Sequence, residues 1–330
     1  MRTSYSRRNR IIGSIVSLFI ITLSAWIFFN SQYIYDLYSF WNYNLSSAVA
    51  DISTRADLTK AGQFYLYASD TTIEDASNFN TSCKQQESGN AILGCYSNNK
   101  IYIYNVNNSE LDGIKEVTAA HEMFHAVWQR QSDSEKTRIS TLLQAAYDKN
   151  VTPELKTRMD YYNRNEKGQF YNELHSILGT EIPNLGPELE AYYSKYFIDR
   201  TKIVGLYANY NKVFEGLATK SKALYDELTS LGQTIDSMES SYNKEVATLN
   251  ANIITFNNKA DNGGFSTTAE FNSERNKLVV RINNVQSEEK DISTRVNTYN
   301  QKYKDYQALI VRSQTITRSI DSTLSPVPSL

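Results

Sequence analysis

The chain has 330 residues and a formal net charge of −2; 41% of its residues are hydrophobic and 21% are charged. The apolar fraction excludes a wholly disordered protein, and a near-neutral chain lacks the basic excess that general nucleic-acid binding needs, so we expect no nucleic-acid partner. The 2 cysteines cannot build a disulfide-dense scaffold or a four-cysteine zinc site, and the chain has only 3 histidines.

The N-terminus has the pattern of a membrane anchor. Residues 1–10 contain four arginines and no acidic residue, and residues 11–29 contain no charge. A helix over that uncharged run would be about 28 Å long, close to the hydrocarbon thickness of a bilayer. Trp26, Tyr33 and Tyr35 suit the far lipid–water interface. We therefore expect a single-pass protein of the cell membrane. It would have a cytoplasmic tail at 1–10, one transmembrane signal anchor at 11–29, and the rest of the chain outside the cytoplasm.

A cleaved signal peptide is the alternative to an anchor. Its apolar core would be about 7–15 residues long and closely followed by small residues at the cleavage site. Here the apolar run is longer, and the Ala-x-Ala at 48–50 lies well beyond it. The uncleaved anchor is the favoured interpretation. Under either interpretation, anchor or signal peptide, the bulk of the chain is exported.

Residues 30–44 are expected to form a juxtamembrane segment and residues 45–204 a folded domain. Two runs early in that domain, 63–68 (QFYLYA) and 100–106 (KIYIYNV), are rich in aromatic and β-branched residues and predict strands. Cys83 and Cys95 lie between them. An exported chain with an even cysteine count favours one disulfide, worth about 2–3 kcal/mol for so short a loop; the alternative is two free thiols.

The second half of this domain has helical patterns. From Asp112 onward apolar residues recur at helical spacing. Ser132 opens a further helix through a capping box, and Thr152 followed by proline starts another. A short helix over 170–178 is expected to stop at Gly179.

Beyond residue 205 apolar residues recur every seven positions, in two segments that both follow a heptad register. Between them, residues 257–268 (NNKADNGGFSTT) form a turn-forming cluster that ends in a capping box. We expect an antiparallel coiled-coil hairpin over 205–324 with a turn near 257–268, and a tail at 325–330. The alternatives are a helical subdomain packed on the core, and heptads that pair with a partner or with a second copy.

Residues 117–128 (VTAAHEMFHAVW) indicate a metal site. His121 and His125 are four positions apart, so on a helix both imidazoles leave the same face and can bind one metal ion. Glu122 lies beside them, where it can act on a water held by that metal. This is the His-Glu-x-x-His arrangement of zinc peptidases; the alternative is two unrelated histidines on a helix.

A catalytic zinc site needs a third protein ligand, with water in the fourth position. Trp128 and Gln131 stand where the elongated zincin motif has glycine and histidine, which excludes the metzincin pattern. The later segment FYNELHSILGTE holds three candidates, Glu173, His175 and Glu181. On a regular helix Glu173 and His175 point in nearly opposite directions, so both ligate only if the helix is distorted.

The two motifs together resemble the gluzincin peptidases, in which a second helix bearing Asn-Glu-x-x-Ser follows the first motif. Here that second motif reads Asn172-Glu173-Leu-His-Ser176, and the resemblance covers about residues 100–182. It implies an α+β zincin-like catalytic domain, mostly helical, with His121, His125 and Glu173 as zinc ligands and Glu122 as general base.

Two further expectations come from this resemblance. The strand at 100–106 would match the family's edge strand, which pairs with an extended substrate. His175 has no required counterpart in the family, and we expect it to stabilise the oxyanion or to orient a ligand. The catalytic residues predicted are thus Glu122 and His175.

These patterns predict a membrane-anchored, extracytoplasmic zinc metallopeptidase that hydrolyses a peptide or protein substrate by zinc-activated water. One alternative is a non-enzymatic cell-surface protein that acts through its coiled coil and has a structural or degenerate zinc site. Another is a metallohydrolase of cell-wall peptide cross-links, because the water-activation chemistry is the same.

Overall fold

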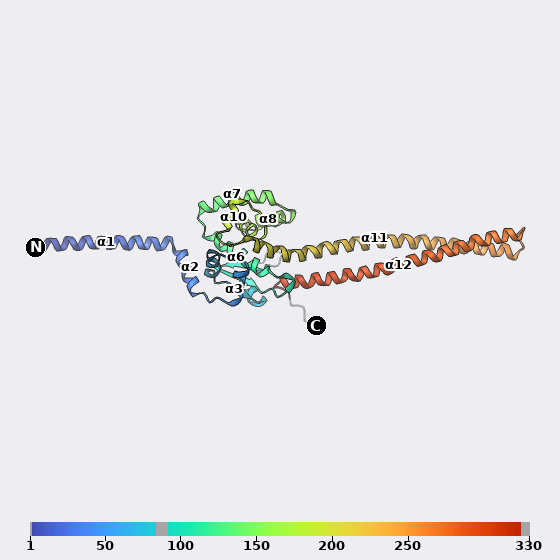
Figure 1. Ribbon diagram of the computed structural model, residues 1–330, viewed down its shortest axis with the longest axis horizontal. Helices are drawn as coiled ribbons and strands as arrows, with labels where there is room; N and C mark the ends of the chain where they lie inside the picture. Colours follow the sequence, from blue (N-terminus) through green and yellow to red (C-terminus); the bar gives the residue numbers. More distant parts are fainter. Residues whose placement is uncertain (1, 84–91, 325–330) are drawn as a thin grey trace. The chain divides into compact units, whose positions relative to one another are not determined.

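The computed structural model describes residues 2–83 and 92–324 (Figure 1). The predicted tail at 325–330 lies outside the described residues. Of these described residues 79% are helical, and three short strands among them form one small sheet. The chain divides into two compact units: the first contains Met1–Val213 and Ile316–Leu330, and the second contains Phe214–Thr315.

Regular structure occupies most of both units. The helices are α1 (Arg2–Phe29), α2 (Ser31–Asn42), α3 (Ser47–Arg55), α4 (Lys60–Ala68), α5 (Ala76–Ser82), a 3₁₀ turn (Ser109–Leu111), α6 (Ile114–Arg130), α7 (Asp133–Asn150), α8 (Pro153–Asn165), α9 (Phe170–Glu181), α10 (Pro187–Tyr193), α11 (Arg200–Asp261) and α12 (Thr268–Ile320). The strands are β1 (Thr72–Glu74), β2 (Gly94–Ser97) and β3 (Lys100–Tyr104).

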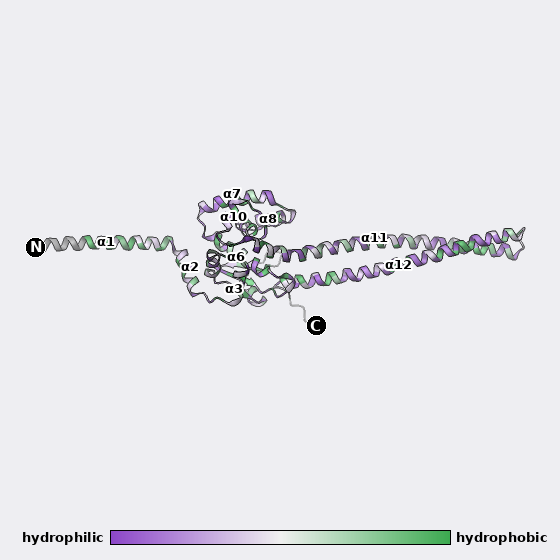
Figure 2. Ribbon diagram, viewed as in Figure 1, coloured by the Kyte–Doolittle hydropathy of each residue, from purple (hydrophilic) through white to green (hydrophobic). Residues whose placement is uncertain are grey.

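Helix α1 contains the uncharged run from which the sequence predicts a membrane anchor. Its segment Ile11–Phe29 has a mean hydropathy of 2.3, and none of it is buried in the protein. Figure 2 shows these apolar residues along α1. The helix is therefore long and apolar enough to cross a membrane or to act as a signal sequence.

Residues 63–68 belong to helix α4, so the strand predicted there is wrong. The Thr59 hydroxyl starts the helix by accepting a hydrogen bond from the Gly62 amide (3.2 Å). Phe64 and Tyr67, one turn apart, pack against Phe40 of α2 with ring centroids 5.4 and 6.2 Å away. An aromatic run favours a strand only where it has sheet neighbours, and here packing against another helix overrides that propensity.

The strand predicted at 100–106 is confirmed as β3. It lies in the centre of a sheet ordered β1-β3-β2, parallel to β1 and antiparallel to β2. Ile101 and Ile103 are fully buried, while the alternate residues are half-buried. The expectation that this strand is the edge is wrong, because β1 and β2 occupy both of its hydrogen-bonding sides. Strand β2, which passes beside α6, is an edge of the sheet.

Two predicted helix starts are confirmed. The Ser132 hydroxyl accepts a hydrogen bond from the Glu135 amide (3.3 Å) at the start of α7. The Thr152 hydroxyl accepts one from the Leu155 amide (3.2 Å) at the start of α8, which begins with proline. These caps satisfy amides that have no acceptor within their own helix.

Helix α9 continues through Gly179 to Glu181, so the expectation that this glycine ends the helix is wrong. A Cβ atom at position 179 would lie 2.7 Å from Tyr193 Cε1 and 2.8 Å from Phe124 Cε2. The absence of a side chain therefore lets α9 approach α6 and α10 closely.

The core of the first unit lies where α6 and α9 pack together. Both helices carry apolar residues at helical spacing, and their buried faces meet. The fully buried residues at this contact are Met123, Phe124 and Val127 on α6 and Leu174, Ile177 and Leu178 on α9. Burial of each large side chain stabilises the fold by about 1.5–3 kcal/mol, and the packing fixes how α9 is rotated against α6.

The second unit is an antiparallel pair of helices, α11 and α12, which lie side by side in Figure 1. Buried heptad residues line their contact: Leu228, Ile235 and Leu249 on α11, and Val285 and Ile292 on α12. At the turn Gly263 adopts a φ of 67°, and the Thr267 hydroxyl caps α12 by accepting from the Glu270 amide (3.0 Å). The hairpin pairs within one chain, and its turn lies inside the predicted 257–268.

Candidate metal centre

Helix α6 presents two histidines on one face. His121 and His125 are one turn apart, and their ring centroids are separated by 4.8 Å. Both side chains are mostly buried yet reachable, with 15% and 12% of their surface exposed. The helix forms here because Val117, Ala120 and Phe124 recur at helical spacing and bury the opposite face in the core. The histidines therefore lie on one face of a rigid helix whose opposite face is packed in the core.

Helix α9 brings Glu173 to these two rings. Its Oε2 atom lies 3.6 Å from His121 Nε2, and its Oε1 atom lies 3.6 Å from His125 Nε2. Burial alone raises the pKa of Glu173, but His125 and His121 outweigh this and lower the pKa to about 2. Glu173 is therefore a buried carboxylate that stays ionised and faces both imidazoles.

Asn172 orients the second histidine. Its Oδ1 atom lies 3.0 Å from His125 Nδ1, while its own amide donates to Gln169 Oε1 (2.8 Å). Because the amide nitrogen is used by Gln169, the oxygen faces the ring, and His125 Nδ1 donates to it. A donor at Nδ1 is the arrangement that a histidine needs if its Nε2, on the side of Glu173, is to bind a metal ion. The Ser176 hydroxyl, 3.4 Å from the same Nδ1, completes the contact.

Glu122 lies between the histidines and the sheet. Its Oε2 atom is 4.0 Å from His125 Nε2, and the ligand atoms of His121, Glu122 and His125 all lie within 4.8 Å of one another. These three residues form a group that can hold a metal ion. A Cβ atom on Gly94 of β2 would come within 3.0 Å of Glu122 Oε1. The edge strand thus passes directly alongside this carboxylate.

His175 points away from this group. It is fully buried between α6 and α10, with Nε2 2.9 Å from the Tyr192 hydroxyl. The rings of Phe124 and Trp128 pack against it, at centroid distances of 5.0 and 5.3 Å. Burial lowers the pKa of His175 to about 3, so the ring is neutral. The regular helix α9 places it opposite Glu173, and the structure does not bring it to the oxyanion or ligand position predicted for it.

Glu181, the remaining candidate ligand, is also directed elsewhere. Its two carboxylate oxygens accept hydrogen bonds from the Arg158 guanidinium at 2.7 and 2.8 Å. The carboxylate is buried, and this bidentate pair joins α9 to α8. Of the three candidates, Glu173 is the one that meets both histidines.

The two cysteines form the predicted disulfide. Cys83, which follows α5, is bonded to Cys95 in the middle of β2. Cys95 directly follows Gly94, so the covalent link holds the strand that passes beside Glu122. The disulfide therefore supports the edge of the candidate site.

A buried ion pair behind the site was not predicted. Asp36 of α2 accepts hydrogen bonds from Arg130 Nε (2.7 Å) and Nη2 (2.6 Å), in the last turn of the histidine-bearing helix. Arg130 Nη1 also donates to the Tyr96 hydroxyl on β2 (2.8 Å). The sequence contains one indication of this ion pair, because Asp36 is the only charged residue between positions 11 and 50.

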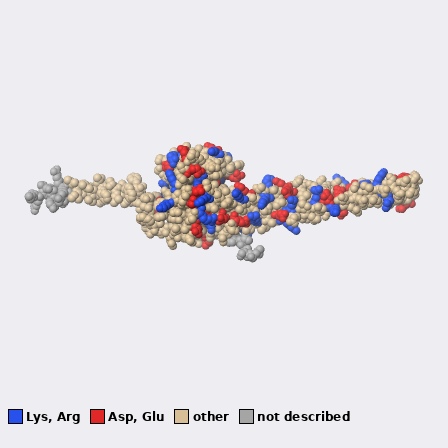
Figure 3. Space-filling view, in the orientation of Figure 1, with Lys and Arg blue, Asp and Glu red and all other residues tan. Residues whose placement is uncertain are grey.

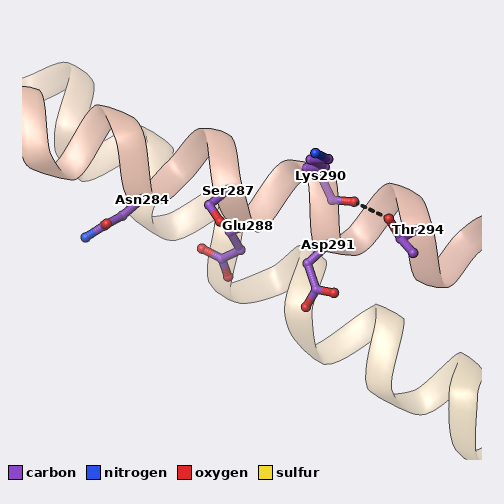
Figure 4. Close-up of a pocket in the computed structure, with 6 residues that line it drawn as sticks. All are labelled: Asn284, Ser287, Glu288, Lys290, Asp291 and Thr294. Atoms are coloured by element: carbon purple, nitrogen blue, oxygen red, sulfur yellow. Dashed lines mark hydrogen bonds between the residues drawn. The ribbon is translucent and has the colours of Figure 1, made fainter.

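The hollow in Figure 4 belongs to the hairpin unit. It is lined by polar residues of α12: Asn284, Ser287, Glu288, Lys290, Asp291 and Thr294. The Thr294 hydroxyl donates to the Lys290 carbonyl (2.8 Å), which is an ordinary bond within a helix. Five of the six residues are exposed and the other is half-buried, so this hollow has no buried chemistry comparable with that of the histidine group.

No protein-family model, characterised protein or solved structure matches this chain. The interpretation of the site therefore depends on its own geometry. That geometry gathers two imidazoles and two carboxylates at the meeting point of α6, α9 and β2.

Proposed function

We propose that the protein is a membrane-anchored zinc metallopeptidase. His121, His125 and Glu173 would bind the zinc ion, and Glu122 would be the general base. The observation that carries this proposal is the position of Glu173, with one carboxylate oxygen 3.6 Å from each histidine Nε2. A metal site with these ligands and an adjacent carboxylate that does not bind the metal is the arrangement that peptide hydrolysis requires.

The donor set fits zinc. Two imidazole nitrogens and one carboxylate are a common catalytic set, and such ligands around a tetrahedral ion lie about 3.3–3.4 Å apart. The separations of 3.6 Å between Glu173 and the two rings are close to this value. The hydrogen bond from His125 to Asn172 supports the same conclusion, because it holds Nε2 in the form that binds a metal.

The chain's own groups would perform the remaining chemistry. A zinc ion held by these residues would act as a Lewis acid, which would lower the pKa of a bound water towards 7 and polarise the substrate carbonyl. The Glu122 carboxylate would take a proton from the attacking water and deliver it to the leaving amine. Glu173 and Asn172 would keep both imidazoles in place during these transfers.

Strand β2 is the element that would align the substrate. Its one partner in the described sheet is β3, and it runs beside Glu122. An extended peptide adding to this edge would place its backbone next to the general base. A peptide or protein substrate is therefore a better fit than a compact small molecule.

The location proposed is the cell membrane, with the metal centre and the hairpin outside the cytoplasm. The support is the uncharged α1 segment together with the four arginines that precede it. The disulfide between Cys83 and Cys95 agrees with an oxidising compartment.

The test uses the full-length protein in detergent. Zinc content is measured by mass spectrometry, and cleavage of an unfolded fluorescent protein is followed with and without a chelator. We expect one zinc per chain and chelator-sensitive cleavage. Glu122→Gln should retain zinc and lose about 10²–10⁴-fold in rate, since this is the usual contribution of general acid–base catalysis. Glu173→Gln should lose cleavage activity and should also bind zinc more weakly.

Glu154→Gln is the matched control, because it makes the same change on the exposed surface of α8 and should alter neither zinc content nor rate. An active, zinc-bound Glu122→Gln protein would refute the role of Glu122. Stoichiometric zinc without hydrolysis of any substrate would instead favour a non-enzymatic protein with a structural zinc site.

A further inference from the structure

Helix α2 belongs to a long stretch of chain with almost no charge. Between residues 11 and 50 the only charged residue is Asp36, and its side chain is buried. The exposed surface of this whole stretch is therefore uncharged. Figure 3 shows that the visible surface over α2 lacks the lysine, arginine and acidic side chains found elsewhere on the same unit.

The two faces of α2 differ sharply. One face packs on α4 and carries Asp36, and just beyond the helix the Tyr43 hydroxyl donates to the Thr71 carbonyl (2.6 Å). The other face presents Tyr38 and Trp41, three positions apart, which are 66% and 78% exposed. Leaving such large aromatic rings in water forfeits the stabilisation that their burial provides. An exposed aromatic face of this kind marks an interaction surface.

Chain continuity identifies what covers this face. The apolar segment of α1 ends at Phe29, and α2 begins at Ser31, so one residue separates the two helices. If α1 spans a bilayer, α2 starts at the level of the lipid headgroups. Tryptophan and tyrosine are the side chains enriched there, because each has an apolar ring and a polar group.

We infer that α2 lies in the interfacial layer of the membrane that α1 spans, with Tyr38 and Trp41 in contact with lipid. The inference rests on the membrane anchoring proposed above. The opposite face of α2 is bonded through Asp36 to Arg130, five residues after His125 on the same helix. The membrane contact is thus linked directly to the helix that carries the proposed metal ligands.

The experiment places a nitroxide label on α2 in the full-length protein, reconstituted in phosphatidylcholine vesicles. The label is attached at Tyr38→Cys, and the native cysteines do not compete because they form a disulfide. Tyr225→Cys, on an exposed tyrosine of the hairpin, is the matched control. Electron paramagnetic resonance then compares collisions of each label with oxygen, which concentrates in lipid, and with a water-soluble nickel complex.

We expect the label at position 38 to shift towards oxygen and away from nickel relative to the label at position 225. Equal accessibility to nickel at both positions would overturn the inference. Protection of position 38 from both reagents would overturn it as well, since a protein partner or a second copy would then cover the face.

Flotation of the vesicles separates this inference from the anchor on which it rests. Protein that floats with the vesicles but exposes position 38 to nickel refutes the interfacial helix alone. Protein that does not float refutes the anchor, and the inference with it. Circular dichroism of the labelled protein, compared with that of the wild type, checks that its helical fold is retained.

Discussion

The buried ion pair between α2 and α6 allows a sharp test of how the first unit is held together. The side chain of Asp36 is 3% exposed and that of Arg130 is 5% exposed, and two hydrogen bonds of 2.6 and 2.7 Å join them. Gln32 also donates to Asp36 (2.9 Å). Asp36→Asn preserves the shape of the side chain but removes its charge, which leaves the Arg130 guanidinium buried without a counter-ion.

The expected loss of stability follows from these contacts. Removing one partner of a buried ion pair costs about 3–5 kcal/mol, because the other charge stays desolvated. The asparagine oxygen can still accept one hydrogen bond, and Arg130 keeps its bonds to the Tyr96 hydroxyl and the Ala126 carbonyl. We therefore expect a loss near the lower end, about 3 kcal/mol.

Tryptophan fluorescence during urea unfolding measures this loss selectively. All 3 tryptophans lie in the first unit, so the hairpin does not contribute to the signal. Asp51→Asn, the same substitution at an exposed position of α3, is the control and should change the free energy of unfolding by less than about 0.5 kcal/mol. In the double variant Asp36→Asn with Arg130→Gln, stability should partly recover, because no buried charge remains unpaired.

A loss below about 1 kcal/mol would refute this reasoning, since that is the value of a solvated surface pair. A double variant less stable than the sum of the two single changes would also contradict it. Either result would mean that α2 is held by its aromatic contacts rather than by the ion pair.

Three further predictions concern the site and the buried histidine of α9. Gly94→Ala should sharply reduce cleavage while zinc content is unchanged, because the added Cβ would collide with Glu122 and displace either that carboxylate or the edge strand; unchanged cleavage would place the substrate elsewhere. Asn172→Ala should weaken zinc affinity about 10–100-fold, measured by competition with a chelating dye, because His125 loses the acceptor that holds its ring. Burial lowers the pKa of His175 from 6.5 to about 3, so its contribution to stability is present above pH 6.5 and is lost as the pH falls towards 3. Zinc-free wild-type protein should therefore lose about 2 kcal/mol more than His175→Gln between pH 7 and pH 5, and equal losses would show that the ring is not buried in neutral form.

Local patterns predicted the parts of the site that lie on one helix. His121, Glu122 and His125 are neighbours because of helical periodicity alone, which requires no knowledge of the fold. The same holds for the hairpin, whose heptads and capping residues act over a few turns. The strand at 63–68 was wrongly predicted because an aromatic run is compatible with either structure until its packing partner is known.

Long-range contacts decided the remaining features. The sequence by itself determined an uncharged helix of membrane length, a pair of histidines on one helix face that can hold a metal ion, and a long helical hairpin, since each depends on residues close together in the chain. Only the tertiary structure decided that Glu173 rather than His175 or Glu181 meets the histidines, because this depends on which face of α9 packs against α6. It alone also decided that β3 is central and that Asp36 lies against Arg130. Such contacts join residues that are far apart in the chain, and burial in a common core sets them rather than any local preference.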